Sequence, residues 1–293
     1  MNKLILSEFE NFLVNDKNVS PSTLASYKRD IANFSKFIAK IKIDLISVSR
    51  NHILSYILSM QDSGKANASV MRAIASLKSL YSFLIYKGTI TKNPVFGITP
   101  PKKEKKIPQF LSHIEIEALL ESPDVSTLRG LRDKAILEIM YATGLKVTEL
   151  ITLDLKDIDT DLGYIKCSKS SGIRIVPLGK PAVNAAKSYI GVARPQMACD
   201  GEKTLFVNCS GHAMSRQGLW KLIKEYADKT GIRKSITPHS LRHSFAVHLL
   251  ENGADLISIQ EMLGHKDASS TQMYARMFHS RLREVYNKAH PRA

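Results

Sequence analysis

Cysteine is scarce in this sequence, and the few thiols fit neither a metal site nor a disulfide framework. Three occur among 293 residues, at Cys167, Cys199 and Cys209. Their spacing matches no zinc-ligand pattern, and an odd number of cysteines suits reduced thiols. We therefore predict a cytoplasmic protein without a bound metal.

Long hydrophobic runs are also missing from the chain. No stretch of about 18 consecutive apolar residues occurs, so we predict no membrane span. Glu8 and Glu10 interrupt the apolar N-terminus too early for a secretory signal. The sequence thus predicts a protein that has no membrane partner.

Negative charge is the third deficit. The chain carries 27 Asp and Glu residues against 42 Lys and Arg, which gives a net charge of +15 and a pI near 9.6. This balance favours a polyanionic partner, and nucleic acid is the first candidate. A basic but merely solvated surface is the alternative that charge alone leaves open.

The spacing of apolar residues divides the chain into three parts, of which the first is helical. Residues 1–96 predict an all-helical domain, because apolar side chains recur at helical spacing, as in 66–86. Gly88 and Asn93-Pro94 are stop signals for that helix. Basic positions are scattered over these segments, so the bundle could cap one side of a duplex. An ordinary bundle with exposed lysines is the alternative.

Residues 97–110, GITPPKKEKKIPQF, form the second part. Its prolines exclude a regular helix, and its lysines form a basic run. We predict an extended interdomain linker that lies along DNA phosphates, where it would add salt-dependent affinity. A solvated tether is the alternative. The lysines of the run are Lys102, Lys103, Lys105 and Lys106.

Residues 111–293 predict a mixed α/β domain. Alternating apolar residues on either side of a polar turn indicate a β-hairpin over 163–178, and 205–207 reads as a short strand. A further helix opens near 214–220. Side chains near a helix start can contact a phosphate or a groove. The candidates for such contacts are Arg216 and Gln217.

Three features at fixed spacing mark the C-terminal part of this domain. The first is His239-x-x-Arg242, on the first turn of a predicted helix, so both side chains share a face. Gly264 ends a second predicted helix, which puts His265 just past a helix end. Tyr274 follows in a short helical segment.

These residue types could act together on one phosphate. The arginine guanidinium can donate two parallel hydrogen bonds to phosphate oxygens. Histidine transfers protons, and tyrosine can serve as a nucleophile. Each residue alone is more often an ordinary packing residue. Only the full set at these spacings is specific.

The set resembles the C-terminal signature of the tyrosine recombinases, the integrase family. The segment HSLRHSFAVHLLENGADLISIQEMLGH, followed by TQMYA, is similar in sequence to the Xer-type branch of the family. The resemblance implies a mainly helical fold with a small β-sheet, arranged as a C-shaped DNA clamp. A helical core-binding, SAM-like domain would span 1–96, and a catalytic domain 111–293. Its C-terminal helix would dock on a neighbouring protomer or on its own domain.

The resemblance also implies catalytic roles. Tyr274 would attack a scissile phosphate and form a 3′-phosphotyrosyl link. Arg242 and His265 would bind the phosphate oxygens, and His239 would assist proton transfer. The covalent link conserves the phosphodiester energy, so neither a metal nor another cofactor is implied.

Two lysines complete the implied set. Lys169, in the hairpin turn, aligns with the general acid of the family, and Lys166 is the fallback. Lys146 stands where the family has its first arginine. A lysine is a single mobile charge, whereas an arginine fork binds two oxygens together. We therefore hypothesise slow strand cleavage, which would reflect natural divergence or a deliberate change.

The implied partners are a double-stranded DNA core site and further protomers. Four copies, in a homo-tetramer or with a second recombinase in a hetero-tetramer, would exchange strands through a Holliday junction, and a septal DNA translocase could activate them. Resolution of chromosome or plasmid dimers and integration or excision of a mobile element both fit. The alternatives are a non-catalytic DNA-binding relic and a type IB topoisomerase that relaxes DNA.

Overall fold

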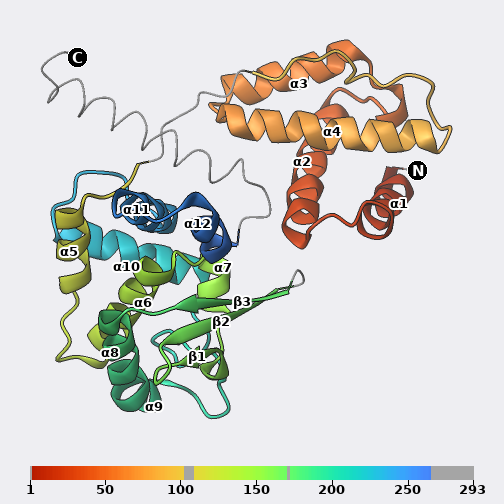
Figure 1. The fold of residues 1–293 in the computed structure, drawn as a ribbon. Helices are drawn as coiled ribbons and strands as arrows, with labels where there is room; N and C mark the ends of the chain where they lie inside the picture. Colours follow the sequence, from red (N-terminus) through yellow and green to blue (C-terminus); the bar gives the residue numbers. More distant parts are fainter. Residues whose placement is uncertain (1, 102–108, 170–171, 265–293) are drawn as a thin grey trace, which may run out of the picture. The chain divides into compact units, whose positions relative to one another are not determined.

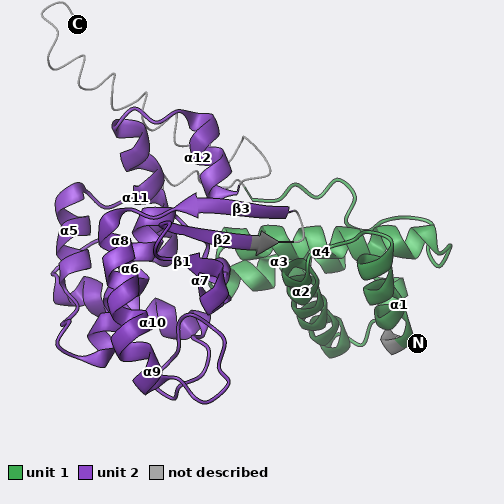
Figure 2. Cartoon of the chain, turned by 60° about the horizontal axis from the view of Figure 1, so that its bottom comes forward, with its two compact units in different colours: residues 1–106 green, residues 107–293 purple. Residues whose placement is uncertain are grey.

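The computed structural model describes residues 2–101, 109–169 and 172–264. The chain divides into two compact units, residues 1–106 and 107–293, which are coloured separately in Figure 2. Each unit has its own hydrophobic core. We describe each by itself.

Unit 1 is a bundle of helices (Figure 1). Its helices are α1 (Asn2–Asn15), α2 (Pro21–Lys40), the 3-10 turn η1 (Leu45–Ser47), α3 (Arg50–Asp62) and α4 (Asn67–Tyr86). Ser20 caps α2, because its hydroxyl accepts a hydrogen bond from the backbone N–H of Thr23 at 3.2 Å. Helix α4 packs against α1, α2 and α3, and its inward face is fully buried. The all-helical prediction for this part is confirmed.

Helix α4 is the one described segment that could cross a membrane by length and composition alone. Half of its most apolar 18-residue window is buried inside the unit, where Val70, Leu77 and Leu80 are completely covered. A core helix passes the same test as a membrane span, so the apolar character of α4 is explained by packing.

A buried ion pair joins α2 to α4. The Asp30 carboxylate is 3% exposed and accepts two hydrogen bonds from the Arg72 guanidinium, at 2.8 and 2.9 Å. The Ser76 hydroxyl donates a third bond at 3.0 Å. The carboxylate is thus buried with partners, as a buried charge requires.

Unit 2 is mainly helical with a small sheet. Its helices are α5 (His113–Glu121), α6 (Leu128–Thr143), α7 (Val147–Ile151), η2 (Leu155–Asp157), α8 (Lys180–Ser188), the π-turn η3 (Tyr189–Ala193), α9 (Arg194–Met197), α10 (Arg216–Lys229), α11 (Pro238–Glu251) and α12 (Leu256–Leu263). Its strands are β1 (Ile158–Asp159), β2 (Tyr164–Lys169) and β3 (Gly172–Pro177). The predicted fold class, mainly α with a small β-sheet, is confirmed.

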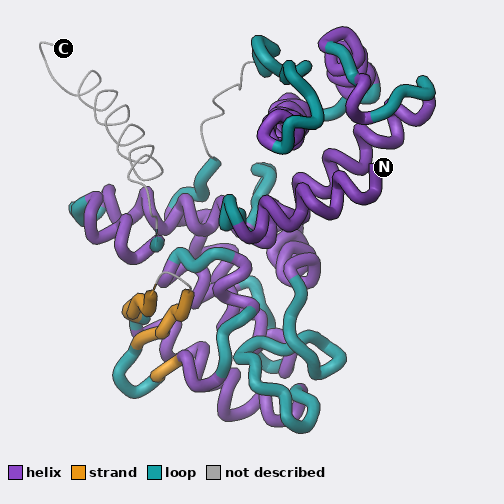
Figure 3. The backbone as a smooth tube through the Cα atoms, turned by 90° about the vertical axis from the view of Figure 1, so that its right-hand side faces the viewer, coloured by secondary structure: helices purple, strands orange, loops and turns teal. Residues whose placement is uncertain are grey.

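The sheet is antiparallel, in the order β1-β2-β3, and Ile165 pairs with Val176 in the hairpin. Figure 3 shows the strands gathered at one side of the unit. The predicted hairpin is confirmed. The strand predicted over 205–207 is wrong, because Val207 makes only an isolated bridge with Ala213. The apolar side chains of 205–207 are buried for packing, without a neighbouring strand to extend the ladder.

Helix α6 is the centre of unit 2. It packs against α8 and α11, and Ile136, Leu137 and Ile139 are completely buried. It ends at Gly144, which has φ +58°, a conformation that glycine adopts at little cost. Gly144 therefore ends the helix in a conformation that other residues rarely adopt.

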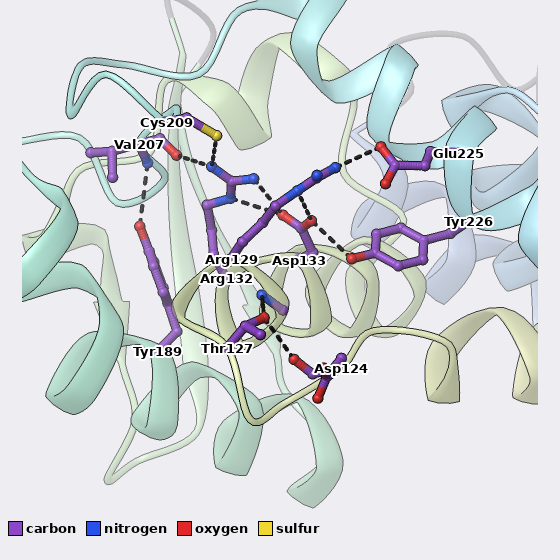
Figure 4. A network of polar contacts seen from close by, with 11 residues as sticks. Asp124, Thr127, Arg129, Arg132, Asp133, Tyr189, Val207, Cys209, Glu225 and Tyr226 are labelled. Atoms are coloured by element: carbon purple, nitrogen blue, oxygen red, sulfur yellow. Dashed lines mark hydrogen bonds and ion pairs between the residues drawn. The ribbon is translucent and has the colours of Figure 1, made fainter.

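A buried polar network fixes α6 to α10 (Figure 4). The Arg132 guanidinium donates to Asp133 at 2.8 Å and to the Val207 carbonyl at 3.1 Å. The Tyr226 hydroxyl donates to the same carboxylate at 3.0 Å. Burial and the Asp133 charge raise the pKa of Tyr226, which therefore stays protonated as a donor.

Candidate active site

The start of α11 carries two of the predicted catalytic residues. The Thr237 hydroxyl accepts from the backbone N–H of Ser240 at 3.2 Å, and Pro238 occupies the first turn. His239 and Arg242 follow within that turn and the next. His239 is exposed and Arg242 is 5% exposed.

The Arg242 guanidinium joins two helix ends. It donates to the carbonyl of Gly144, at the end of α6, and to the carbonyl of Leu263 at 2.7 Å, at the end of α12. Carbonyls at a helix C-terminus carry partial negative charge and favour a cation. Arg242 is therefore held in one orientation by partners far apart in the sequence.

Glycine is required where these helices end. A Cβ placed on Gly144 would lie 2.5 Å from the Phe245 ring and 2.8 Å from the Leu263 side chain. Gly264, after α12, has φ +61°. The close approach of the two helix ends depends on the absence of side chains here.

Lys146 lies two residues beyond Gly144 and is half-buried. Its backbone N–H donates to the Glu149 carboxylate at 2.9 Å, which fixes the start of α7. Through Gly144, the structure brings the Lys146 segment and Arg242 together. Sequence alone did not show this contact between segments about a hundred residues apart.

Glu149 and Arg174 form a second link, which sequence reasoning missed. The Arg174 guanidinium donates to both carboxylate oxygens of Glu149, at 3.0 and 3.2 Å. It also packs so closely against Gly264 that no Cβ could fit there. Burial lowers the pKa of Arg174, whose Nε is buried with no hydrogen-bond partner among the described residues. The only sequence signal was Glu149 following Lys146 at capping-box spacing.

The hairpin carries the predicted general acid. Lys169 ends β2 and pairs with Gly172 across the ladder; its side chain is not described. Lys166, the fallback, is exposed and pairs with Ile175. Because Arg174 lies on β3, its bond to Glu149 connects this hairpin to the start of α7.

His243 is a further neighbour that the motif analysis passed over. Burial, together with the nearby charges of His239 and Arg242, lowers its pKa to about 4. The imidazole is therefore neutral at pH 7. It adds no positive charge beside Arg242.

The remaining predicted residues divide into two groups. Arg216 and Gln217 are exposed at the start of α10, where the Ser215 hydroxyl caps the helix. The others lie outside the described residues. They are His265, Tyr274, Lys102, Lys103, Lys105 and Lys106.

Comparison with known families identifies the chain. The model of the phage integrase family matches residues 109–281, and the model of the N-terminal SAM-like domain of phage integrases matches residues 6–88. The chain is a tyrosine recombinase of the phage integrase family.

Similar proteins cover this recombinase from end to end. Tyrosine recombinase XerD of Listeria innocua is 43% identical, with 100% of both chains covered. A crystal structure of XerA recombinase is 28% identical, covers 100% of both chains, and has a TM-score of 0.56. XerH bound to palindromic difH in a post-cleavage complex covers 95% of this chain and 83% of its own, with a TM-score of 0.74. At 23% identity it supports the fold alone.

Family membership establishes the class of reaction. The recombinase cleaves and rejoins DNA strands in site-specific recombination, so DNA is its partner. The readings as a non-catalytic relic or a type IB topoisomerase are not favoured.

Proposed function

We propose that this recombinase acts as an Xer-type enzyme on paired core sites in the cytoplasm, to resolve chromosome or plasmid dimers. The full-length similarity to XerD supports this role. Integration or excision of a mobile element uses the same chemistry and is the second candidate, favoured by the integrase family match.

The reaction assigns a role to each predicted side chain. The Tyr274 hydroxyl attacks the scissile phosphorus, and the bond from phosphorus to the 5′ oxygen breaks. His239 assists removal of the tyrosine proton, and Lys169 supplies a proton to the departing 5′ oxygen. Arg242 and Lys146 hold the nonbridging oxygens, and His265 forms a hydrogen bond to the phosphate. Attack by the 5′-hydroxyl of the other duplex then restores the phosphodiester and releases the tyrosine.

The anchored guanidinium of Arg242 is the observation that carries this assignment. Donors that are already oriented stabilise charge in the transition state without reorganisation. Arg242 meets this condition, because the carbonyls of Gly144 and Leu263 fix it. Carbonyl partners orient the guanidinium and leave it positively charged.

Lys146 would supply the second cation less well. One missing preorganised donor costs about 2–4 kcal/mol in the transition state. We therefore infer slow strand cleavage, with DNA binding retained. Four protomers, identical or paired with a second recombinase, would complete exchange through a Holliday junction, and a septal DNA translocase would activate them.

A nicked suicide duplex with a core site tests both the chemistry and the attenuation. The wild type, Lys146→Arg and Tyr274→Phe proteins are incubated with it and run on a denaturing gel. We expect a weak covalent band from the wild type, a band that forms about a hundredfold faster in Lys146→Arg, and none in Tyr274→Phe. Equal rates in the first two proteins would disprove attenuation by Lys146.

A plasmid assay separates the biological roles. Directly repeated core sites on one supercoiled plasmid report resolution, and one site on each of two plasmids reports integration. We expect resolution to dominate. A plasmid without a core site is the control, and its relaxation would instead support topoisomerase activity.

A further inference from the structure

The outer part of the β2–β3 hairpin has few side chains that hold β3 to the rest of unit 2. Strand β3 is the edge of the sheet, and successive residues face opposite sides. On one side, Ile173 and Ile175 are 63% and 64% exposed. On the other side, Val176 is completely buried, Arg174 follows it, and Gly172 is exposed without a side chain. Arg174 is therefore the last side chain of β3 before the turn that can fix the strand.

Three segments of unit 2 meet at Arg174. Its guanidinium donates to both carboxylate oxygens of Glu149, at 3.0 and 3.2 Å. Glu149 in turn accepts a hydrogen bond from the backbone N–H of Lys146 at 2.9 Å. The same guanidinium lies directly against Gly264, the residue before His265 in the sequence. The hairpin is thus set against two segments that carry predicted site residues.

The β-ladder connects Arg174 to the predicted general acid. Arg174 pairs with Cys167, and Gly172 pairs with Lys169, so the two pairs are two residues apart along each strand. At about 3.4 Å per residue, the backbone of Lys169 lies about 7 Å farther toward the turn. A change in the tilt of the strands at Arg174 therefore displaces the backbone of Lys169 as well.

The link between Arg174 and Glu149 is directional. Two parallel hydrogen bonds between a guanidinium and a carboxylate fix the orientation of one plane relative to the other. The Arg174 side chain is 16% exposed and the Glu149 side chain 7%, so water has little access to either. Replacing a buried ion pair by apolar side chains is often neutral or stabilising. What this pair adds to apolar packing is a defined orientation of β3 against α7.

We propose that Arg174 is a positioning residue, which orients the hairpin so that Lys169 reaches the departing 5′ oxygen during strand cleavage. This role rests on the proposed function, in which Lys169 is the general acid. A general acid must lie within hydrogen-bond reach of the atom that it protonates. A hairpin released from Glu149 would hold its proton donor out of reach, although Tyr274 and the DNA contacts are unchanged.

A sulfur atom in the DNA separates proton transfer from the rest of the reaction. In a core-site duplex with a 5′-bridging phosphorothiolate, sulfur replaces the 5′ oxygen that departs. The phosphorus–sulfur bond then breaks as the bond from phosphorus to the Tyr274 oxygen forms. The thiolate departs without a proton, because a thiol is a much stronger acid than an alcohol. Covalent protein–DNA bands on denaturing gels give the cleavage rate of this duplex and of the matching oxygen duplex.

The test variant combines Arg174→Met with Glu149→Gln, so that no buried charge is left without a partner. Glutamine keeps an oxygen that can accept from the Lys146 N–H. We expect cleavage of the oxygen duplex to be at least about tenfold slower than in wild type, because misplaced reacting groups slow catalysis strongly. Cleavage of the sulfur duplex should be nearly as fast as in wild type.

Two further variants frame this result. Lys169→Ala removes the general acid itself and should show a larger loss on the oxygen duplex, again with rescue by sulfur. Arg129→Met is the matched control, because it removes an arginine of unit 2 that pairs with Glu225. It should cleave both duplexes as wild type does.

The pattern over the two duplexes decides between positioning and a purely structural role. Partial unfolding slows both duplexes equally, so equal slowing in the double variant would overturn the proposal. A wild-type rate on the oxygen duplex would overturn it as well. Rescue of Lys169→Ala without rescue of the double variant would leave the proposed function standing and remove the role of Arg174. Rescue of neither would show that Lys169 is not the general acid, and both assignments would fall.

Discussion

The two cations beside the predicted phosphate position, Arg242 and Lys146, are held in different ways. Arg242 is buried and fixed by two helix-end carbonyls. Lys146 is half-buried, with its charge at the end of a flexible stem. A rigid fork loses little entropy on binding a phosphate, whereas a lysine must be ordered first. The rate of strand cleavage should therefore change when Lys146 is replaced by arginine, although the charge at that position stays the same.

The free energy of unfolding of this recombinase should decrease as the pH decreases, because His243 is buried in its neutral form. Its pKa is about 4 when folded and about 6.5 when unfolded, so only the unfolded state takes up the proton between these values. Its contribution is present above pH 6.5 and is lost as pH falls toward 4, by up to about 3 kcal/mol. Urea unfolding of wild type and His243→Gln at pH 7 and pH 5 measures it. The variant should lose less stability, and equal losses would contradict the assignment.

Elements in unit 2 are joined by side chains that span long sequence separations. Arg242 links α6, α11 and α12, and Arg174 links β3 to α7 through Glu149. Each link starts or ends at a helix terminus, where backbone carbonyls or a capping carboxylate accept hydrogen bonds. These contacts join segments that carry predicted site residues.

Loss of the Arg174 link should destabilise unit 2. Arg174→Met leaves the Glu149 carboxylate, 7% exposed, without its main partner, and breaking a buried pair costs about 3–5 kcal/mol. Adding Glu149→Gln removes the buried charge and should recover much of the loss. Urea unfolding of the single and double variants tests this. A single variant as stable as wild type would show that solvent replaces Arg174.

At the scale of the whole molecule, the net charge of +15 should govern affinity for DNA. Each phosphate contact contributes about 0.9 to the slope of log affinity against log salt. Replacing the four lysines of 102–106 by glutamine should lower that slope by up to about 4 and weaken binding on any sequence. Fluorescence anisotropy at several salt concentrations measures it.

The matched control for this experiment replaces four exposed lysines of unit 2. They are Lys156, Lys180, Lys203 and Lys229. If the slope of log affinity against log salt decreases equally in both quadruple variants, the linker has no special role. The effect would then be one of net charge alone.

The sequence by itself determined the family and the fold class, and it predicts the reacting groups. Helical spacing and the Gly264 stop are local signals, because they depend on neighbours within a few residues. The His239-x-x-Arg242 motif is equally local. The strand predicted over 205–207 failed because a buried apolar triplet looks the same with or without a partner strand.

Only the tertiary structure decided which distant groups meet. The bonds of Arg242 to Gly144 and Leu263, the pair of Glu149 with Arg174, and the meeting of His113 with His248 involve residues without any fixed spacing. Hydrogen bonds and ring contacts act only over about 3–4 Å. They therefore depend on how helices pack, and no pattern along the chain records that packing.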